Sequence, residues 1–163
     1  MTDVNLYKSQ LENKSPDKFI KRPVTYQDII EGTVDFFEDF FRGAIRFEGK
    51  IDKSFFTKIS IDGYAHLFKR LFQEIYKGEM IFVNFRSLDK TMVLDIIFNP
   101  NSMPECDTVS YLMKIARLSG MAMTMEAGHA KIYFPLATLE ELLVYATTRR
   151  IVRDTLVRCF FEE

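Results

Sequence analysis

Apolar residues recur at helical spacing over residues 25–42, the first segment of the chain with a regular hydrophobic pattern. At about 100° per residue they fall within one broad arc, which is typical of a helix packed on a sheet: Ile29, Ile30, Val34, Phe36, Phe37, Phe40 and Phe41. Thr25 and Asp28 form an approximate capping box, and Gly43 stands where a helix C-cap glycine belongs. The pattern predicts a helix from Thr25 to about Arg42.

Three further segments also have helical spacing. The second helix is predicted over residues 62–77, with Asp62 as its N-cap and Gly78 at its end. A third helix is predicted from Asp107, again as a cap, to residue 119. The sequence Thr138-x-x-Glu141 is a capping box that predicts a C-terminal helical region.

Short runs rich in β-branched and aromatic residues predict six strands in three consecutive pairs. The predicted pairs are 44–47 with 54–61, 80–87 with 91–98, and 121–126 with 130–134. Polar or glycine-containing turns separate the members of each pair, and residues 99–104 form a loop.

Single helices alternate with strand pairs in this order, which favours helices lying on one face of a largely antiparallel sheet. We therefore expect an α+β fold, a two-layer α/β sandwich with a mixed, mostly antiparallel sheet and an extra C-terminal helical region. We divide the chain into a polar leader (1–23), the sandwich domain (24–137) and a C-terminal helical extension (138–163).

Composition narrows the possible partners. The net charge is −1 and the pI about 6.2, which gives no reason to expect nucleic acid or an anionic membrane as a partner. No signal peptide and no apolar run of about 18 residues is visible, so we expect a cytoplasmic protein. Two cysteines and two histidines are widely separated and predict no metal site.

The order of elements resembles the ATP-binding domain shared by gyrase, the ninety-kilodalton heat-shock chaperone, histidine kinases and the mismatch-repair ATPase. Within this superfamily, the chain resembles the histidine kinase branch best. Residues 23–30, with the sequence PVTYQDII, resemble the start of that branch's first helix, and residues 128–135 resemble its last strand. The resemblance covers about residues 23–135 and implies a nucleotide pocket beside the second helix.

In that family the second helix carries an acidic or Asn residue and, four positions later, an Asn that holds Mg²⁺. The apolar spacing matches these positions to Glu74 and Gly78, and Gly78 has no side-chain oxygen for a metal. A register shifted by one residue gives Gln73 and Lys77, and a lysine would repel the ion. Glu74 is the remnant catalytic candidate, although a solvated helix residue is the simpler interpretation.

The family's Asp-x-Gly-x-Gly loop matches Phe98, Pro100 and Ser102. Phe98 cannot accept the adenine hydrogen bond, and Pro100 removes a backbone donor and fixes φ. The next helix begins near Cys106, which leaves no room for the phosphate-binding lid. The resemblance therefore implies a degenerate nucleotide pocket.

Three hypotheses follow. The first is a non-catalytic pseudo-ATPase that acts as an interaction or regulatory module in bacterial signalling and needs no cofactor. The second is a divergent histidine/serine protein kinase or ATPase that uses Glu74 with ATP and Mg²⁺. The third is a small-ligand-binding domain that uses the remodelled pocket.

The C-terminal region is the expected contact surface for a protein partner or a second copy. Its first apolar stripe comprises Leu139, Leu142, Leu143 and Ala146, and a second stripe, out of phase with the first, contains Ile151, Val152, Leu156 and Cys159. The helix either breaks near Thr147–Arg150 or is apolar on two sides. Packing on its own domain and contact with a partner both remain open, and Arg149, Arg150, Arg153 and Arg158 are candidates for an interface rim.

Overall fold

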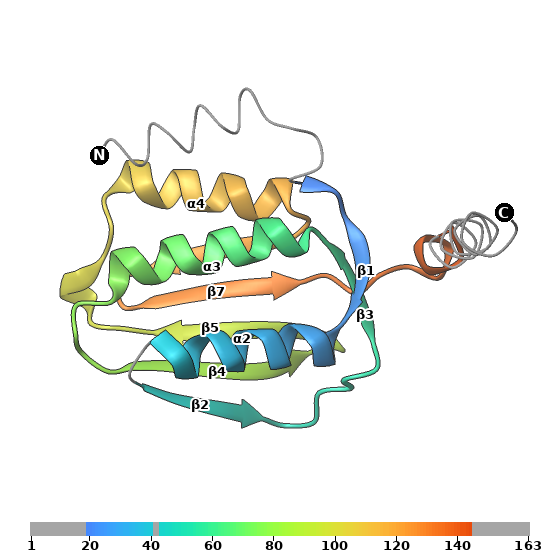
Figure 1. The fold of residues 1–163 in the computed structure, drawn as a ribbon, viewed down its shortest axis with the longest axis horizontal. Helices are drawn as coiled ribbons and strands as arrows, with labels where there is room; N and C mark the ends of the chain where they lie inside the picture. Colours follow the sequence, from blue (N-terminus) through green and yellow to red (C-terminus); the bar gives the residue numbers. More distant parts are fainter. Residues whose placement is uncertain (1–18, 41–42, 145–163) are drawn as a thin grey trace, which may run out of the picture.

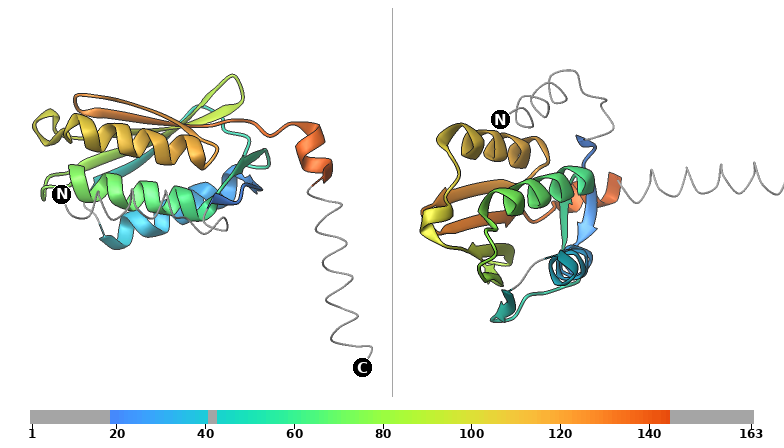
Figure 2. Two further views of the ribbon diagram at one scale, coloured as in Figure 1. Left: turned by 90° about the horizontal axis from the view of Figure 1, so that it is seen from above. Right: turned by 60° about the vertical axis from the view of Figure 1, so that its left-hand side comes forward.

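A computed structural model describes residues 19–40 and 43–144, which form a sheet covered by helices on one face (Figures 1 and 2). The strands are β1 (Arg22–Thr25), β2 (Gly43–Glu48), β3 (Phe56–Ile59), β4 (Ile81–Leu88), β5 (Thr91–Ile97), β6 (Ala122–Glu126) and β7 (His129–Phe134). The helices are α2 (Tyr26–Phe40), α3 (Ile61–Ile75), α4 (Cys106–Leu118) and the short 3-10 turn η2 (Pro100–Ser102). A further helix begins at residue 139 and continues to the end of the described part at residue 144.

Five strands form one sheet in the order β2-β4-β5-β7-β6, and all neighbours are antiparallel except β2 and β4. The predicted α+β two-layer sandwich with a mixed, mostly antiparallel sheet is therefore confirmed. The turn from β4 to β5 has positive φ at both Asp89 and Lys90, the backbone of the two-residue hairpin turns that match strand twist.

The predicted pairing of the first two strands is wrong. β2 pairs in parallel with β4, whereas β3 pairs with β1 in a separate two-stranded sheet. The connection between them is held against the start of α2, because the Tyr26 N–H donates to Phe55 O (2.9 Å) and the Gln27 N–H donates to Lys53 O (3.1 Å). This contact holds residues 53–55 beside the start of α2, so the strand that follows does not return to pair with β2.

Three predicted cap assignments are also corrected. Ser60 caps α3, since its Oγ accepts the Gly63 N–H (3.0 Å), and Asp62 lies in the first turn. Asp107 lies in the first turn of α4, where a negative charge still complements the helix dipole. Gly43 belongs to β2, and a Cβ there would lie 1.7 Å from Ile81 O, so glycine is required for the approach of β2 to β4.

The core lies between the helices and one face of the sheet. Because successive strand residues alternate between faces, one set of side chains is buried under α2, α3 and α4: Ile81, Val83 and Phe85 of β4, Met92, Leu94 and Ile96 of β5, and Ala130, Ile132 and Phe134 of β7. Aromatic edge contacts join the layers, including Tyr64 with Phe134 (5.3 Å between ring centroids). The opposite face of the sheet carries the polar side chains of Asn84, Arg86, Asp95 and Lys131 as well as the apolar ones of Phe82, Val93 and Ile97.

Regular structure is present at both predicted ends of the domain. Arg22 and Pro23, placed in the leader, form the first half of β1. After β7 the chain continues along β3, where the Ala137 N–H donates to Phe56 O (2.8 Å). The capping box is confirmed, since Thr138 Oγ1 accepts the Glu141 N–H (3.1 Å). Ile151, Val152 and Leu156 lie outside the described residues, as does the possible break at 147–150.

Candidate functional site

A polar hollow of about 320 Å³ opens beside the C-terminal half of α3, and we call it the α3–α4 hollow. Its walls are α3, the segment 101–105 and the first turns of α4. The lining residues are Arg70, Glu74, Lys77, Asn101, Ser102, Met103, Pro104, Glu105 and Thr108. Four of these side chains carry charge, two of each sign, so no single sign dominates the hollow.

An ion pair within α3 forms one wall of this hollow. Arg70 Nη2 lies 3.0 Å from Glu74 Oε1, and the two side chains are 7% and 27% exposed. Residues four apart lie on the same face of a helix, which brings the two groups together without any other element. The guanidinium therefore neutralises the carboxylate where both border the hollow.

The loop after β5 forms a second wall, and its backbone donors are used within the loop. The Asn101 N–H donates to Asn99 Oδ1 (2.9 Å), and the Ser102 N–H donates to Asn99 O (2.9 Å). The Met103 N–H donates to Pro100 O (3.3 Å). Asn99 also donates from Nδ2 to Glu79 Oε2 (2.6 Å), which ties the loop to the segment after α3.

The β6–β7 turn holds the start of this loop in place. Phe98 is buried in the core, and its N–H donates to Gly128 O (3.0 Å). Gly128 has a φ of +82°, and a Cβ there would lie 3.0 Å from both Phe98 O and Pro100 Cγ. Only glycine can adopt this positive φ and also leave room for these two atoms without strain.

The structure brings some predicted site residues together and separates others. Glu74 and Ser102 line the α3–α4 hollow, and Phe98 lies in the core. Pro100 is exposed and does not line the hollow. Gly78 also lies outside it, beyond the last residue of α3, with a φ of +82°.

Sequence reasoning missed several residues that line the hollow, Arg70 above all. The signal was available, because Arg70 precedes Glu74 by one helical turn and so shares its face. The pair with four-residue spacing that borders the hollow is thus Arg70 and Glu74, one turn before the pair expected from the sequence. Glu105 and Thr108 were missed because loop and helix meet here only in three dimensions.

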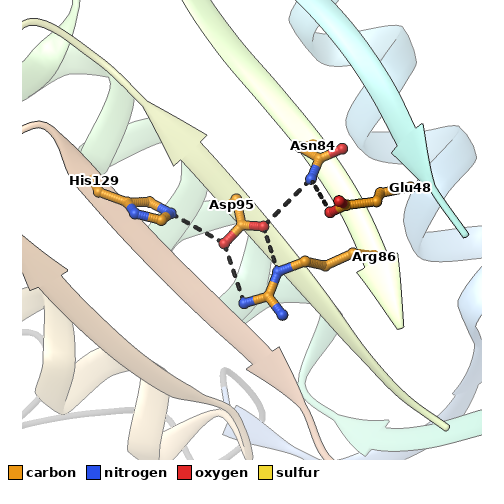
Figure 3. Close-up of polar contacts among 5 residues, drawn as sticks. All are labelled: Glu48, Asn84, Arg86, Asp95 and His129. Atoms are coloured by element: carbon orange, nitrogen blue, oxygen red, sulfur yellow. Dashed lines mark hydrogen bonds and ion pairs between the residues drawn. The ribbon is translucent and has the colours of Figure 1, made fainter. Parts of the chain in front are cut away.

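A second polar cluster lies on the open face of the sheet, centred on the buried carboxylate of Asp95 (Figure 3). Arg86 Nε donates to Asp95 Oδ2 (2.6 Å), His129 Nε2 lies 3.0 Å from Asp95 Oδ1, and Asn84 Nδ2 lies 3.4 Å from Oδ2. The hydrogen bond with Asp95 raises the pKa of the Arg86 guanidinium above its ordinary value. The cluster joins β4, β5 and β7 across their polar face.

The described residues, 19–40 and 43–144, contain no group of three or more His, Cys, Asp or Glu side chains arranged to hold a metal ion. Within the same part of the chain, no helix is both long enough and apolar enough to cross a membrane.

Comparison with known proteins identifies the fold. No protein-family model matches the sequence, and no curated protein matches it. Among solved structures, the cytoplasmic segment of histidine kinase QseC is similar, with 15% identity, a TM-score of 0.52, and coverage of 83% of this chain and 94% of that chain. The Acinetobacter baumannii histidine kinase AdeS is also similar, with 9% identity, a TM-score of 0.53, and coverage of 84% of this chain and 77% of that chain.

The chain therefore has the fold of the histidine kinase ATP-binding domain, as the resemblance in the sequence predicted. At these identities the similarity establishes the fold alone, and activity has to be argued from the site.

Proposed function

We propose that this chain is a non-catalytic, histidine-kinase-like domain, a pseudo-ATPase, that acts as a protein-interaction or regulatory module in bacterial signalling. The histidine kinase fold supports the class of protein. The composition of the α3–α4 hollow supports the absence of ATP chemistry. The proposal needs no cofactor, whereas ATP and Mg²⁺ belong to the alternative of a divergent kinase.

The observation that carries the proposal is the closed hydrogen bonding of the loop between β5 and α4. Phosphate-binding loops present free backbone N–H groups to the ligand. Here the N–H groups of Asn101, Ser102 and Met103 all donate to acceptors within the loop. A phosphate would have to break these bonds to be held by the same groups.

The charges around the hollow support the same conclusion. Mg²⁺ requires oxygen ligands, and the Glu74 carboxylate is already paired with Arg70. Glu105 and Asp107 lie at the N-terminus of α4, where they favour the helix and repel an incoming phosphate. The buried Phe98 has no side-chain acceptor for an adenine amino group.

A second candidate function is the binding of a small polar ligand. The hollow, at about 320 Å³, is within the usual range for small-molecule sites. Its lining offers charges of both signs together with the hydroxyl groups of Ser102 and Thr108. A small ligand with both donor and acceptor groups would match this lining better than a triphosphate.

The test is a calorimetric titration of the full chain with ATP and ADP, with and without Mg²⁺, alongside the melting temperature. A ligand at 100 times its Kd stabilises the folded state by about 2.7 kcal/mol. For a chain of this size that shift is several degrees, at roughly 2–4 °C per kcal/mol. We expect no heat of binding and no shift at millimolar nucleotide, whereas an active histidine kinase domain measured in parallel should show both.

Saturable binding would contradict the pseudo-ATPase proposal and favour the divergent kinase. In that case Glu74→Ala should abolish binding, because Glu74 borders the hollow. Asp62→Ala is the matched control, since Asp62 is an exposed acid at the other end of α3, outside the hollow.

A further inference from the structure

An apolar groove runs between α2 and α3 on the helical side of the domain, with a volume of about 160 Å³. We call it the α2–α3 groove. Its apolar lining comprises Ile29, Phe36, Ile61, Tyr64, Ala65 and Phe68. Phe36 and Phe68 meet edge to face, with 5.6 Å between ring centroids, and Ile61 is 47% exposed. The groove thus presents apolar surface that the described residues leave open to solvent.

The exposed surface of α2 beside this groove is acidic, and Asp28 is the α2 acid that lines the groove itself. Helix α2 contains acidic residues but no Lys or Arg, and Asp28, Glu31, Asp35 and Glu38 are all exposed. On the α3 side, Lys69 lines the groove, and its Nζ lies 5.7 Å from the centroid of the Phe36 ring. An apolar floor beside an acidic helix is suited to an amphipathic segment with basic flanks.

The chain leaves the described part of the structure at the end of the domain where β1 and β3 lie, from which α3 starts (Figure 1). Leu136 bridges to Thr57 of β3, and Lys58 Nζ lies 3.9 Å from Glu141 Oε2. Helix α3 starts at Ile61, two residues after β3 ends, and the groove is lined by the first half of α3. Residues 145–163 therefore continue from the same end.

The sequence of residues 145–163 has the complementary chemistry. At helical spacing five of its apolar side chains would fall within one half of the helix circumference, and Val157 and Phe161 would fall on the other half: the five are Ile151, Val152, Leu156, Cys159 and Phe160. Residues 149–158 contain four arginines (149, 150, 153 and 158) and one acid, Asp154, and Glu162 and Glu163 follow, so residues 145–163 carry a net charge of +1. The basic part of the segment, residues 149–158, thus overlaps the apolar stripe and complements the exposed acids of α2.

We propose that residues 145–163 bind the α2–α3 groove of their own chain, with the apolar stripe on the groove floor and the arginines beside the acids of α2. A helix of this length would span about 28 Å, more than the half of α3 that lines the groove. The tether raises the local concentration of the segment to about millimolar, which favours the chain's own groove over that of a second copy. The segment would then compete with any partner helix for this surface.

Disulfide trapping tests the proposal with the native Cys159 as one partner. In the full chain carrying Cys106→Ser, Ala65→Cys places a thiol in the groove, and Gly32→Cys places one on its α2 side. Thr124→Cys is the control, an exposed position on the open face of the sheet. We expect an intramolecular disulfide to Cys159 in at least one groove variant, at least roughly tenfold faster than in the control, because docking would hold Cys159 beside the groove whereas the tether alone acts equally on both positions.

Each outcome on a non-reducing gel bears on the proposal. A disulfide within the monomer supports it. A crosslinked dimer whose yield rises with protein concentration would overturn it in favour of a second copy as the occupant. Equal trapping rates at the groove and control positions would overturn it altogether.

A charge exchange supplies an independent readout. Asp35→Arg should slow trapping roughly threefold, the scale of a surface ion pair, and Asp35→Arg with Arg153→Asp should restore the rate. Glu126→Arg, on the open face of the sheet, should change nothing. A trapping rate unaffected by Asp35→Arg would contradict the assigned orientation of the segment.

Discussion

The two halves of α3 line two surfaces of different chemistry. The first half borders the apolar α2–α3 groove, and the second half borders the polar α3–α4 hollow. One continuous buried stripe supports both: Tyr64, Leu67, Phe68, Leu71, Phe72 and Ile75. The hollow has opposite charges paired within it, whereas the groove joins open apolar surface to the acidic exposed side of α2. This difference favours the groove for binding a protein segment and argues against a triphosphate in the hollow.

Removing a shared core side chain should have the largest effect on both surfaces. Phe72 is fully buried and packs against Phe37 and Phe68 at centroid distances of 5.7 and 4.3 Å. Phe72→Ala should lower the free energy of unfolding by about 3–5 kcal/mol, measured by urea denaturation. The exposed neighbour variant Gln73→Ala should stay within about 0.5 kcal/mol of wild type, and similar losses in the two variants would contradict this packing.

The close approach of α3 to the end of α4 provides the next largest effect. A Cβ on Gly63 would lie 1.9 Å from Ser119 Oγ and 2.8 Å from Ser119 Cβ. Gly63→Ala should therefore cost about 1–3 kcal/mol of unfolding free energy, as overpacking does. Adding Ser119→Gly removes both obstructing atoms and should recover part of that loss. Strictly additive effects in this double-mutant cycle would contradict the contact.

Alkaline pH should lower the free energy of unfolding through Tyr64, which lies at the groove end of α3. Tyr64 OH lies 2.6 Å from Thr33 Oγ1, and burial raises the pKa of Tyr64 above its ordinary value of 10.0. Because the folded-state pKa is the higher one, the stability from the neutral phenol is complete below about pH 10 and is lost as pH rises toward the folded pKa. The loss should reach about 1.4 kcal/mol per pH unit.

Urea denaturation between pH 9 and pH 11 measures this dependence. Tyr64→Phe should show a shallower decline in unfolding free energy than wild type, since one titrating group is removed. Thr33 Oγ1 keeps its bond to Ile29 O (2.6 Å) in the variant. Part of the decline should remain, because burial also raises the pKa of Tyr26. Parallel curves for the two proteins would contradict the assignment.

The smallest effect concerns Gly32, which lies within α2. A Cβ at this position would point into space that the described residues leave open. Gly32→Ala should stabilise a chain ending at residue 144 by about 0.5–1 kcal/mol, through helix propensity. In the full chain we expect a smaller gain, because the methyl group would meet the segment bound in the groove. Equal gains in the two chains, measured by thermal unfolding, would count against an occupied groove.

Local patterns predicted the helices, the hairpin from β4 to β5 and the hairpin from β6 to β7. The pairing of β2 with β4 was not predictable in the same way, because it depends on the contact between residues 53–55 and the start of α2. Among the residues that line the α3–α4 hollow, Glu74 and Ser102 had been named from the family resemblance. Arg70 escaped notice because the apolar spacing matched the family's pair to Glu74 and Gly78, one turn later.

To predict the polar cluster on the open face of the sheet, one would have needed the strand register. Asp95 interrupts an apolar run, which is a visible signal, but its partners come from neighbouring strands. Only the alignment of Asn84 with Asp95 in β4–β5 and of Lys131 with Asp95 in β5–β7 shows which side chains surround it.

The most direct test of the central claim is residue-resolved: amide chemical shifts of the full chain during a titration with Mg·ATP to several millimolar. Because the loop N–H groups are already bonded and Glu74 is paired with Arg70, we predict no saturable shift at Asn101, Ser102 or Thr108. Saturable shifts concentrated at these three residues would mean that the α3–α4 hollow binds nucleotide, and would contradict the account.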